Sequence, residues 1–276
     1  MQCKTGPFVK WAGGKKQLLD RLEAHMPATY GRYYEPFIGG GALLLHLQPE
    51  RAVINDTNEQ LLNVYRQLKT DAEAVIAAVN ALDAKPCDVD RYMETRQAYN
   101  AKIQAHELDA ECAALMIWIN KHCFNGLYRV NSKGLFNVPY NNKQGGVSID
   151  ATNLRNIGLY LRTKDVAIHQ GDFEAACADV QPGDFIYFDS PYVPVSETAN
   201  FTDYTKDGFT LEDHKRLATL YKRLSEQGVK AMLSNNNVPL VHELYSGFTI
   251  KEVNVRRAIN RDASKRSGKE VIITNY

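Results

Sequence analysis

The residues best suited to chemistry are Asp189, Ser190, Pro191 and Tyr192, which directly follow the apolar run 185–188. A carboxylate, a turn stiffened by proline and an aromatic ring therefore stand at the carboxyl end of a predicted buried strand. In open α/β sheets, ligands bind at that edge. The combination suits a flat heterocycle with an exocyclic amino group, because Tyr192 can stack on the ring while Asp189 and a turn carbonyl accept the two amino hydrogens.

A glycine turn, Phe37-Ile38-Gly39-Gly40-Gly41, separates a predicted strand from a predicted helix. Gly39 and Gly41 stand where a backbone must approach a ligand and where bulk would block close helix–strand packing. Asp56 ends the next predicted strand, where an acid can accept hydrogen bonds from ribose hydroxyls. The alternative is that Asp56 caps the helix that starts at Thr57. The order of strand, glycine turn, helix, strand and acid predicts a nucleotide-binding half-sheet.

A second glycine motif covers Lys10-Trp11-Ala12-Gly13-Gly14-Lys15. Gly13 and Gly14 before a predicted short helix would leave free amides for an anion, and Lys15 adds a full charge. A phosphate or the carboxylate of an amino acid would suit. The spacing does not match a Walker loop. Trp11 could be ordinary core, or it could face a sulfonium or an adenine.

The elements that position these motifs are strands and helices of an α/β domain. The predicted strands are 33–37, 52–54, 166–168, 185–188, 231–233 and 271–273. Helices are predicted near 18–22 and at 42–47, 57–69, 71–82, 90–105 and 109–123, and residues 125–146 read as loop. We therefore expect a catalytic domain of residues 1–56 and 145–276, interrupted by a mainly helical insertion at 57–144.

Composition limits the cellular context and the kinds of site. The chain of 276 residues has a formal net charge of +1, and no stretch is long and apolar enough to span a bilayer. We expect a cytoplasmic protein that does not bind membranes. The five cysteines are scattered and odd in number, which predicts reduced core thiols. Neither they nor the seven histidines have metal-ligand spacing, so no metal is expected.

Basic residues gather near the carboxyl end. Between positions 256 and 269 the chain carries Arg256, Arg257, Arg261, Lys265, Arg266 and Lys269 against the single acid Asp262. Such a run is either a solvated face or a contact surface for nucleic-acid phosphates, and the second interpretation gains weight only beside other motifs.

Taken together and in order, these stretches resemble the Dam family of DNA adenine N6-methyltransferases, of the type that modifies GATC. The motifs that carry the resemblance are 8–15, 35–41, 124–129, 136–139, 189–192 and 198–202, and the likeness continues to the final 273–276. One position departs from the family: Ser190 stands where the D-P-P-Y motif has its first proline. Pro191 still restrains Ser190 toward extended geometry, so we expect retained activity.

The resemblance implies a Rossmann-like, S-adenosylmethionine-dependent methyltransferase sheet with an inserted, mainly helical DNA-recognition subdomain. The cofactor would be S-adenosylmethionine and its product S-adenosylhomocysteine. By resemblance, Asp172 and Phe173 edge the cofactor adenine. The other implied cofactor-binding residues are Trp11, Lys15, Phe37, Gly39, Gly41, Asp56 and Asp189. The protein would act on double-stranded DNA, as a monomer.

Residues 124–129, the reader loop, would recognise the DNA. The resemblance implies that Arg129 reads the guanine, with Leu127 and Pro139 near the remaining bases. Phe124 would wedge beside the flipped adenine, and Asn125 would contact the orphaned thymine. Phe124 could instead be core packing at a helix end, and Arg129 a surface salt bridge.

Contacts to the DNA backbone are expected elsewhere. Arg256 and Arg257 would hold phosphates, which position a duplex without specifying its sequence. Asn200, Phe201 and Tyr204 would line the backbone or the flipped nucleotide.

Ser190 leaves two other functions open. A serine beside a proline–aromatic pair is also typical of cytosine N4-methyltransferases, although here the acid Asp189 precedes the serine. The second alternative is a Dam-like DNA-binding protein whose catalysis Ser190 impairs.

Overall fold

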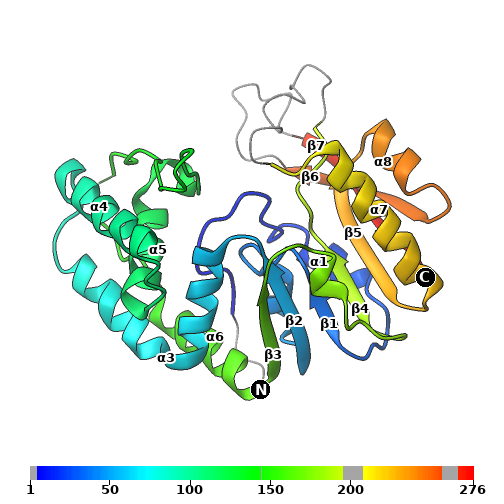
Figure 1. The fold of residues 1–276 in the computed structure, drawn as a ribbon, viewed down its shortest axis with the longest axis horizontal. Helices are drawn as coiled ribbons and strands as arrows, with labels where there is room; N and C mark the ends of the chain where they lie inside the picture. The colour runs from blue at the N-terminus through cyan, green and yellow to red at the C-terminus, as the bar shows by residue number, and fades with distance from the viewer. Residues whose placement is uncertain (1–4, 144, 195–207, 257–266) are drawn as a thin grey trace. The chain divides into compact units, whose positions relative to one another are not determined.

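The computed structural model describes residues 5–143, 145–194, 208–256 and 267–276 (Figure 1). In chain order the elements are α1 (Leu19–Ala24), β1 (Tyr33–Glu35), α2 (Ala42–Leu47), β2 (Arg51–Asp56), α3 (Glu59–Asp83), α4 (Val89–Ala105), α5 (Ala110–His122), η1 (Phe124–Gly126), α6 (Ala151–Thr163), β3 (Asp165–Gln170), η2 (Ala175–Cys177), β4 (Phe185–Phe188), α7 (Leu211–Glu226), β5 (Lys230–Asn236), α8 (Pro239–Leu244), β6 (Thr249–Arg256) and β7 (Ser267–Thr274).

The strands form a seven-stranded sheet in the order β3-β2-β1-β4-β5-β7-β6. β1 pairs in parallel with β2 and with β4, and Tyr33 stands opposite both Ala52 and Phe185. β4 and β5 are parallel, whereas β7 runs antiparallel between β5 and β6. The strand order reverses between β1 and β4, which makes this pair the topological switch point. The expected Rossmann-like α/β sheet is confirmed.

Chain contacts divide the protein into two compact units. The first comprises the described parts of Met1–Gly14, Ile38–Glu50 and Asn55–Gly171, and it contains the long helices α3 to α6. α3 packs against α5 and α6 (Figure 1). It kinks at Asp71, whose φ of −151° is not helical and whose side chain accepts a hydrogen bond from Ala74 N. The sequence predicts this break, since separate helices were expected at 57–69 and 71–82.

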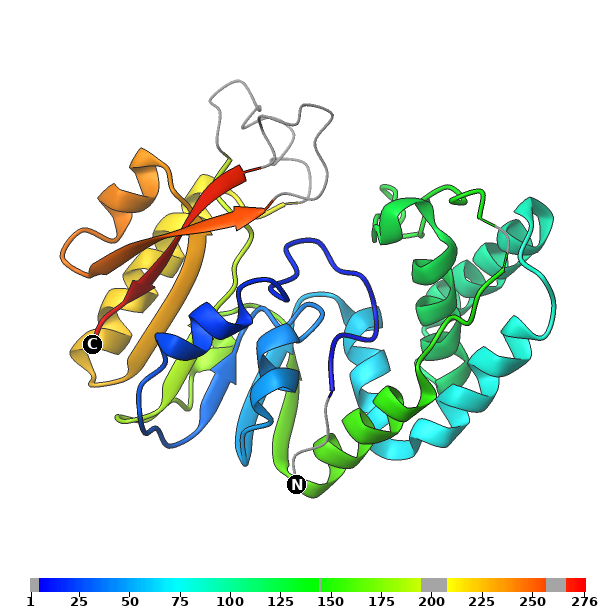
Figure 2. The same cartoon turned by 180° about the vertical axis from the view of Figure 1, so that it is seen from behind.

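The second unit comprises the described parts of Lys15–Phe37, Arg51–Ile54 and Asp172–Tyr276. All four side chains of β4 are buried, as expected of a central strand of a parallel sheet. α7 lies along β5 and begins with a capping box formed by Thr210 and Asp213 (Figure 1). β6 and β7 form an antiparallel hairpin, seen from behind in Figure 2.

Cys87, Cys112, Cys123 and Cys177 are all buried and none forms a disulfide, which confirms the predicted core thiols for the cysteines that the structure describes. Over the described residues, no helix is both long and apolar enough to cross a membrane.

Candidate active site

Asp189 directly follows β4, at the carboxyl end of the strand where the sheet order reverses. The sequence places it there because four apolar residues, all buried in the structure, precede it. Phe37 follows β1, the neighbouring parallel strand, and so belongs to the same sheet edge. This is the edge at which doubly wound sheets bind their ligands.

Lys15 and Asp189 form a buried ion pair. Lys15 Nζ lies 2.6 Å from Asp189 Oδ1, and Lys15 is only 5% exposed. The same ammonium lies 4.6 Å from the centroid of the Tyr192 ring, within cation–π distance. Burial raises the pKa of Asp189, and this outweighs the lowering by Lys15 and by a hydrogen bond from Ser234. The acid, the cation and the aromatic face are therefore in contact within one unit.

The expected anion site at Gly13 and Gly14 needs correction. α1 begins only at Leu19, so the two glycines do not precede a helix N-terminus. The Gly14 amide donates to Trp11 O at 3.2 Å, closing a turn. The charge of Lys15 is directed to Asp189. The helix itself lies near the predicted 18–22, but turn residues separate it from the two glycines.

The turn after Asp189 is held by residues that the motifs do not include. Val193 N donates to Asn235 Oδ1 at 2.9 Å, and Asn236 Nδ2 donates to Val193 O at 2.6 Å. The Tyr192 hydroxyl donates to Glu270 Oε2 at 3.0 Å. The signal that could have found Asn235 and Asn236 is a polar run at the end of a strand that is otherwise apolar.

The Ser190 hydroxyl is buried and has no hydrogen-bond partner among the described residues. An unsatisfied buried hydroxyl costs about 1–3 kcal/mol. Ser190→Ala is therefore expected to raise the free energy of unfolding by about 1 kcal/mol, measured by urea denaturation. Ser225→Ala is the matched control, since Ser225 Oγ both donates to Tyr221 O and accepts from Asn275. Equal destabilisation in both variants would contradict the assignment.

An aromatic cluster surrounds Phe37 in the second unit. Its ring stacks on Phe173 with centroids 5.4 Å apart, and both rings contact Phe209. Arg216 covers Phe173, with its guanidinium carbon 4.9 Å from the ring centroid, and donates to Asp172 Oδ1 at 3.0 Å. The structure thus brings together Phe37, Asp172 and Phe173. Arg216 and Phe209 were not predicted, because neither belongs to a motif.

His214 is buried beside this cluster, edge-on to Phe209 with centroids 4.8 Å apart. Burial lowers its pKa to about 4. Since the unfolded chain binds this proton near pH 6.5, the contribution to stability is complete above that pH and is lost as the pH falls toward 4. We expect His214→Phe to remove up to about 3 kcal/mol of this loss. Urea denaturation at pH 7 and 4.5 gives the free energy of unfolding of both proteins. An equal fall between the two pH values in the native protein and the variant would contradict this role of His214.

In the first unit, Asp56 holds the glycine turn. Its Oδ2 accepts from Gly39 N at 3.0 Å and its Oδ1 from Asn58 N at 2.9 Å. Asn58, not Asp56, caps α3, since the Asn58 side chain accepts from Leu61 N. The cap alternative for Asp56 is therefore wrong. Burial raises the pKa of Asp56 against the lowering by these amide donors.

Gly39 and Gly41 are required by close packing as well as by conformation. Both have positive φ, +47° and +66°. A side chain at Gly39 would lie 2.9 Å from Trp11 Cδ1, and one at Gly41 would meet the Tyr65 hydroxyl. The two glycines are therefore needed for close packing against Trp11 and Tyr65, while their approach to a ligand stays a prediction.

The reader loop exposes most of its residues. Phe124 is 51% exposed and Leu127 43%, while Asn125 and Arg129 are also exposed. Phe124 N donates to Pro139 O at 2.8 Å, which pairs the loop with the 136–139 motif. Phe124 is therefore not a core residue. Its contact with DNA stays a prediction.

Asn137 orients the guanidinium of Arg129 through two hydrogen bonds. Its Nε donates to Asn137 Oδ1 at 2.8 Å and its Nη2 to Asn137 O at 3.3 Å. Across the described residues Arg129 makes no ion pair, so the salt-bridge alternative is not observed. The guanidinium keeps donors for a partner beyond the protein.

Two contacts connect the loop to the rest of the first unit. The Tyr128 ring, half-buried between exposed neighbours, packs at a tilt against the Trp11 ring with centroids 5.3 Å apart. The buried Asn120 side chain, on α5, exchanges hydrogen bonds with the Lys10 backbone and donates to Gly126 O at 3.0 Å. A lone asparagine in an apolar helix is the signal that could have found Asn120.

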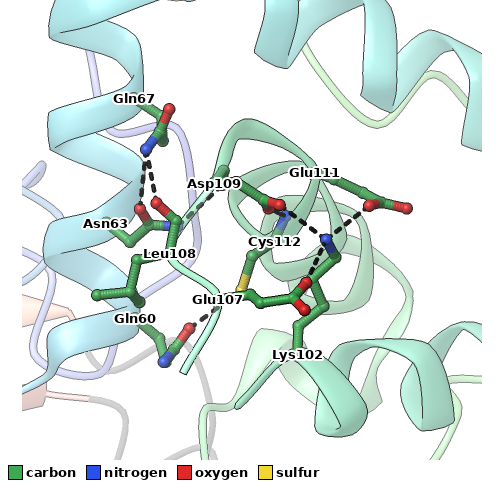
Figure 3. Close-up of polar contacts among 9 residues, drawn as sticks. All are labelled: Gln60, Asn63, Gln67, Lys102, Glu107, Leu108, Asp109, Glu111 and Cys112. Atoms are coloured by element: carbon green, nitrogen blue, oxygen red, sulfur yellow. Dashed lines mark hydrogen bonds and ion pairs between the residues drawn. The ribbon is translucent and has the colours of Figure 1, made fainter. Parts of the chain in front are cut away.

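The opposite end of α5 is fixed by polar contacts (Figure 3). Lys102 of α4 makes ion pairs of 2.7–2.9 Å with Glu107, Asp109 and Glu111, and Asp109 caps α5. From α3, Gln67 Nε2 donates to Leu108 O at 2.8 Å. Each exposed pair contributes little alone, but the set joins three helices at the turn that starts α5.

Several predicted residues cannot be placed. Arg256 ends β6, and its side chain is not among those described. Arg257, Asn200, Phe201 and Tyr204 lie outside the described residues, as do positions 198–202. Within the part of the chain that is described, no group of three or more His, Cys, Asp or Glu side chains could hold a metal ion.

Residues 11–259 match the family described as the D12 class of N6 adenine-specific DNA methyltransferases. The chain belongs to this family. Its members act on adenine, so the family resemblance is confirmed and the protein is an adenine-specific DNA methyltransferase. The cytosine alternative is not supported.

Relatives in this class align along nearly the whole chain. The chain is 43% identical over 272 residues to type II methyltransferase M1.LlaDCHI of Lactococcus lactis subsp. cremoris, covering 98% of this chain and 95% of the relative. It is 39% identical over 287 residues to type II methyltransferase M.MjaIII of Methanocaldococcus jannaschii, covering 98% and 99%. It is 31% identical over 281 residues to the DNA adenine methylase of Serratia marcescens, covering 99% of each.

Proposed function

We propose that this D12 methyltransferase transfers the methyl group of S-adenosylmethionine to N6 of a flipped adenine, within GATC, in double-stranded DNA. The observation that carries the proposal is Asp189, at the carboxyl end of β4 beside the switch point, in contact with Lys15 and adjoining Tyr192. Asp189 suits the amino group of an aminopurine, and Tyr192 suits its ring.

Asp189, Ser190, Pro191 and Tyr192 form the catalytic turn in this proposal. The N6 lone pair is delocalised into the purine ring, which makes the nitrogen a poor nucleophile. Asp189 and the Ser190 carbonyl accept its two hydrogens, pull the nitrogen toward tetrahedral geometry and aim the lone pair at the methyl donor. Tyr192 stacks on the base. Catalysis then comes from positioning and charge placement, without a metal.

Cofactor binding is proposed from the chemistry of two sets of side chains. S-adenosylmethionine supplies an electrophilic methyl group when bound. In the first unit, Asp56 offers a carboxylate to ribose hydroxyls, and Trp11 an aromatic face beside the Gly39–Gly41 turn. In the second, the cluster of Phe37, Phe173 and Asp172 suits an adenine ring, and Lys15 and Asp189 complete the set.

DNA recognition is assigned to residues 57–144, and the catalytic domain to 1–56 and 145–276. Phe124 is exposed, as a residue that wedges into a duplex must be. Extruding the adenine costs about a few kcal/mol, which side chains that fill the gap offset. Asn125, Leu127, Arg129 and Pro139 supply the remaining base contacts, and Arg256 and Arg257 the phosphate contacts.

Nucleoside mass spectrometry tests the proposal. The protein is incubated with S-adenosylmethionine and either a GATC duplex or a duplex with the same bases in scrambled order. N6-methyladenine in the GATC duplex alone is the expected result. Equal methylation of both would reject GATC specificity while keeping the enzyme. Methylation of neither, in both the native protein and Ser190→Pro, would favour the DNA-binding alternative.

A further inference from the structure

Two buried hydroxyls, those of Ser234 and Tyr187, are connected to Asp189 by hydrogen bonds. Ser234, on β5, donates its hydroxyl hydrogen to Asp189 Oδ1 at 3.1 Å. The Tyr187 hydroxyl, on β4, lies 2.9 Å from Ser234 Oγ. Neither Tyr187 nor Ser234 is exposed. The residues therefore form a chain of hydroxyl groups that leads from the core to the carboxylate and belongs to no motif of the sequence.

Counting hydrogens fixes the direction of this chain. A hydroxyl has one hydrogen, and that of Ser234 is donated to Asp189. The hydrogen between Tyr187 and Ser234 must therefore come from Tyr187. Both hydrogens point toward the carboxylate.

We propose that Ser234, oriented by Tyr187, is a positioning residue that fixes the rotation of the Asp189 carboxylate toward the target amino group. Oδ1 is occupied by Lys15 at 2.6 Å and Ser234 at 3.1 Å. For Oδ2, the described residues provide no hydrogen-bond donor. With Oδ1 anchored on one side by a cation and on the other by a hydroxyl, Oδ2 is left to accept the amino hydrogen. This inference rests on the proposed role of Asp189.

The same geometry argues against a proton relay. A hydroxyl pair whose hydrogens both point at Asp189 cannot accept the proton that methyl transfer releases unless both hydroxyls turn. Burial raises the pKa of Tyr187 well above its ordinary value, so its hydroxyl stays protonated. Tyr187 and Ser234 therefore hold the carboxylate in place, and the Ser234 hydrogen bond lowers the Asp189 pKa against the raising by burial.

The test compares Ser234→Ala with the native enzyme in steady-state and single-turnover methylation across pH. We expect kcat to fall about 10- to 100-fold, the value of one hydrogen bond to a charged group, with the KM for DNA and for S-adenosylmethionine within about twofold. The acid limb of kcat should move to higher pH, because a bond that lowers the pKa of Asp189 is lost. Ser234→Cys, with a weak donor of similar size, should recover part of the rate.

Controls separate this role from a structural one. Ser225→Ala removes a serine of α7 whose hydroxyl, among the described residues, bonds Tyr221 and Asn275, and it should change neither kcat nor the acid limb. Tyr187→Phe should lower kcat only about two- to fivefold, because Ser234 keeps its hydrogen bond to the carboxylate. Thermal unfolding shows whether each variant is folded at the assay temperature.

The outcomes distinguish the inference from the proposal beneath it. Native kcat and an unmoved acid limb in folded Ser234→Ala, with Asp189→Asn inactive, would overturn the role of Ser234 alone. A fall in kcat of the same size at every pH, without recovery in Ser234→Cys, would also overturn it. Full activity in Asp189→Asn would overturn the proposed role of Asp189.

Discussion

Asp189→Asn is expected to lower kcat for adenine methylation by about a thousand-fold or more. Asparagine keeps the shape of the side chain but removes the charge that attracts the amino hydrogens. Loss of a single preorganised group that stabilises transition-state charge typically costs about 10²–10³ in kcat, and here the buried ion pair with Lys15 is lost as well. Single-turnover transfer of a radiolabelled methyl group measures the effect, and retention of a tenth of the native kcat would contradict it.

The stability of this variant needs its own control. Removing one partner of a buried ion pair costs up to about 3–5 kcal/mol, because the other charge loses its compensation. Asp189→Asn combined with Lys15→Met removes both charges and should regain stability while remaining inactive. In the native enzyme the acceptor must be ionised, so kcat should decline as the pH falls through the Asp189 pKa. Because burial raises that pKa, the decline should begin above pH 3.8.

Arg129→Ala is expected to relax specificity at the guanine of the target. A bidentate arginine–guanine contact contributes about 1–3 kcal/mol, so the ratio of kcat/KM between the native site and a guanine-substituted site should fall roughly 5- to 150-fold. Discrimination at the other positions should remain. The measurement is kcat/KM on duplexes in which each base pair is replaced in turn.

Two neighbours provide controls for Arg129. Asn137→Ala removes the carboxamide that orients the guanidinium. It should also reduce discrimination at the guanine, by a smaller factor than Arg129→Ala. Lys133→Ala removes an exposed charge from the following turn and should weaken binding to all duplexes evenly. If Arg129→Ala instead lowers kcat/KM by the same factor for every duplex, whatever its sequence, then Arg129 contacts phosphate and not a base.

Much of this architecture is predictable because it rests on local patterns. The run 185–188 consists of hydrophobic and aromatic residues without a charge, so a buried strand ending at Asp189 follows directly. Positive φ at Gly39 and Gly41 follows from a glycine turn between strand and helix. The helices predicted at 90–105 and 109–123 agree with α4 and α5 within a residue at each end.

What escaped prediction depends on contacts between distant segments. Ser234 lies 45 positions from Asp189 in the sequence, and nothing in its own neighbourhood indicates a carboxylate. Lys15 could be interpreted as an anion ligand until its partner was seen to be Asp189. The helix expected near 18–22 is present as α1, but the turns between Gly14 and Leu19 were not foreseen, so the two glycines do not stand at its N-terminus.

The sheet pairing has a consequence for how the chain folds. Tyr33 pairs with Phe185, and every helix of the first unit from α3 to α6 is encoded between them. Local helical contacts can form within microseconds, whereas a parallel pairing of such long range must first close the intervening loop. Assembly of the central strands, and with them the edge that carries Asp189, is therefore expected to be the slow part of folding.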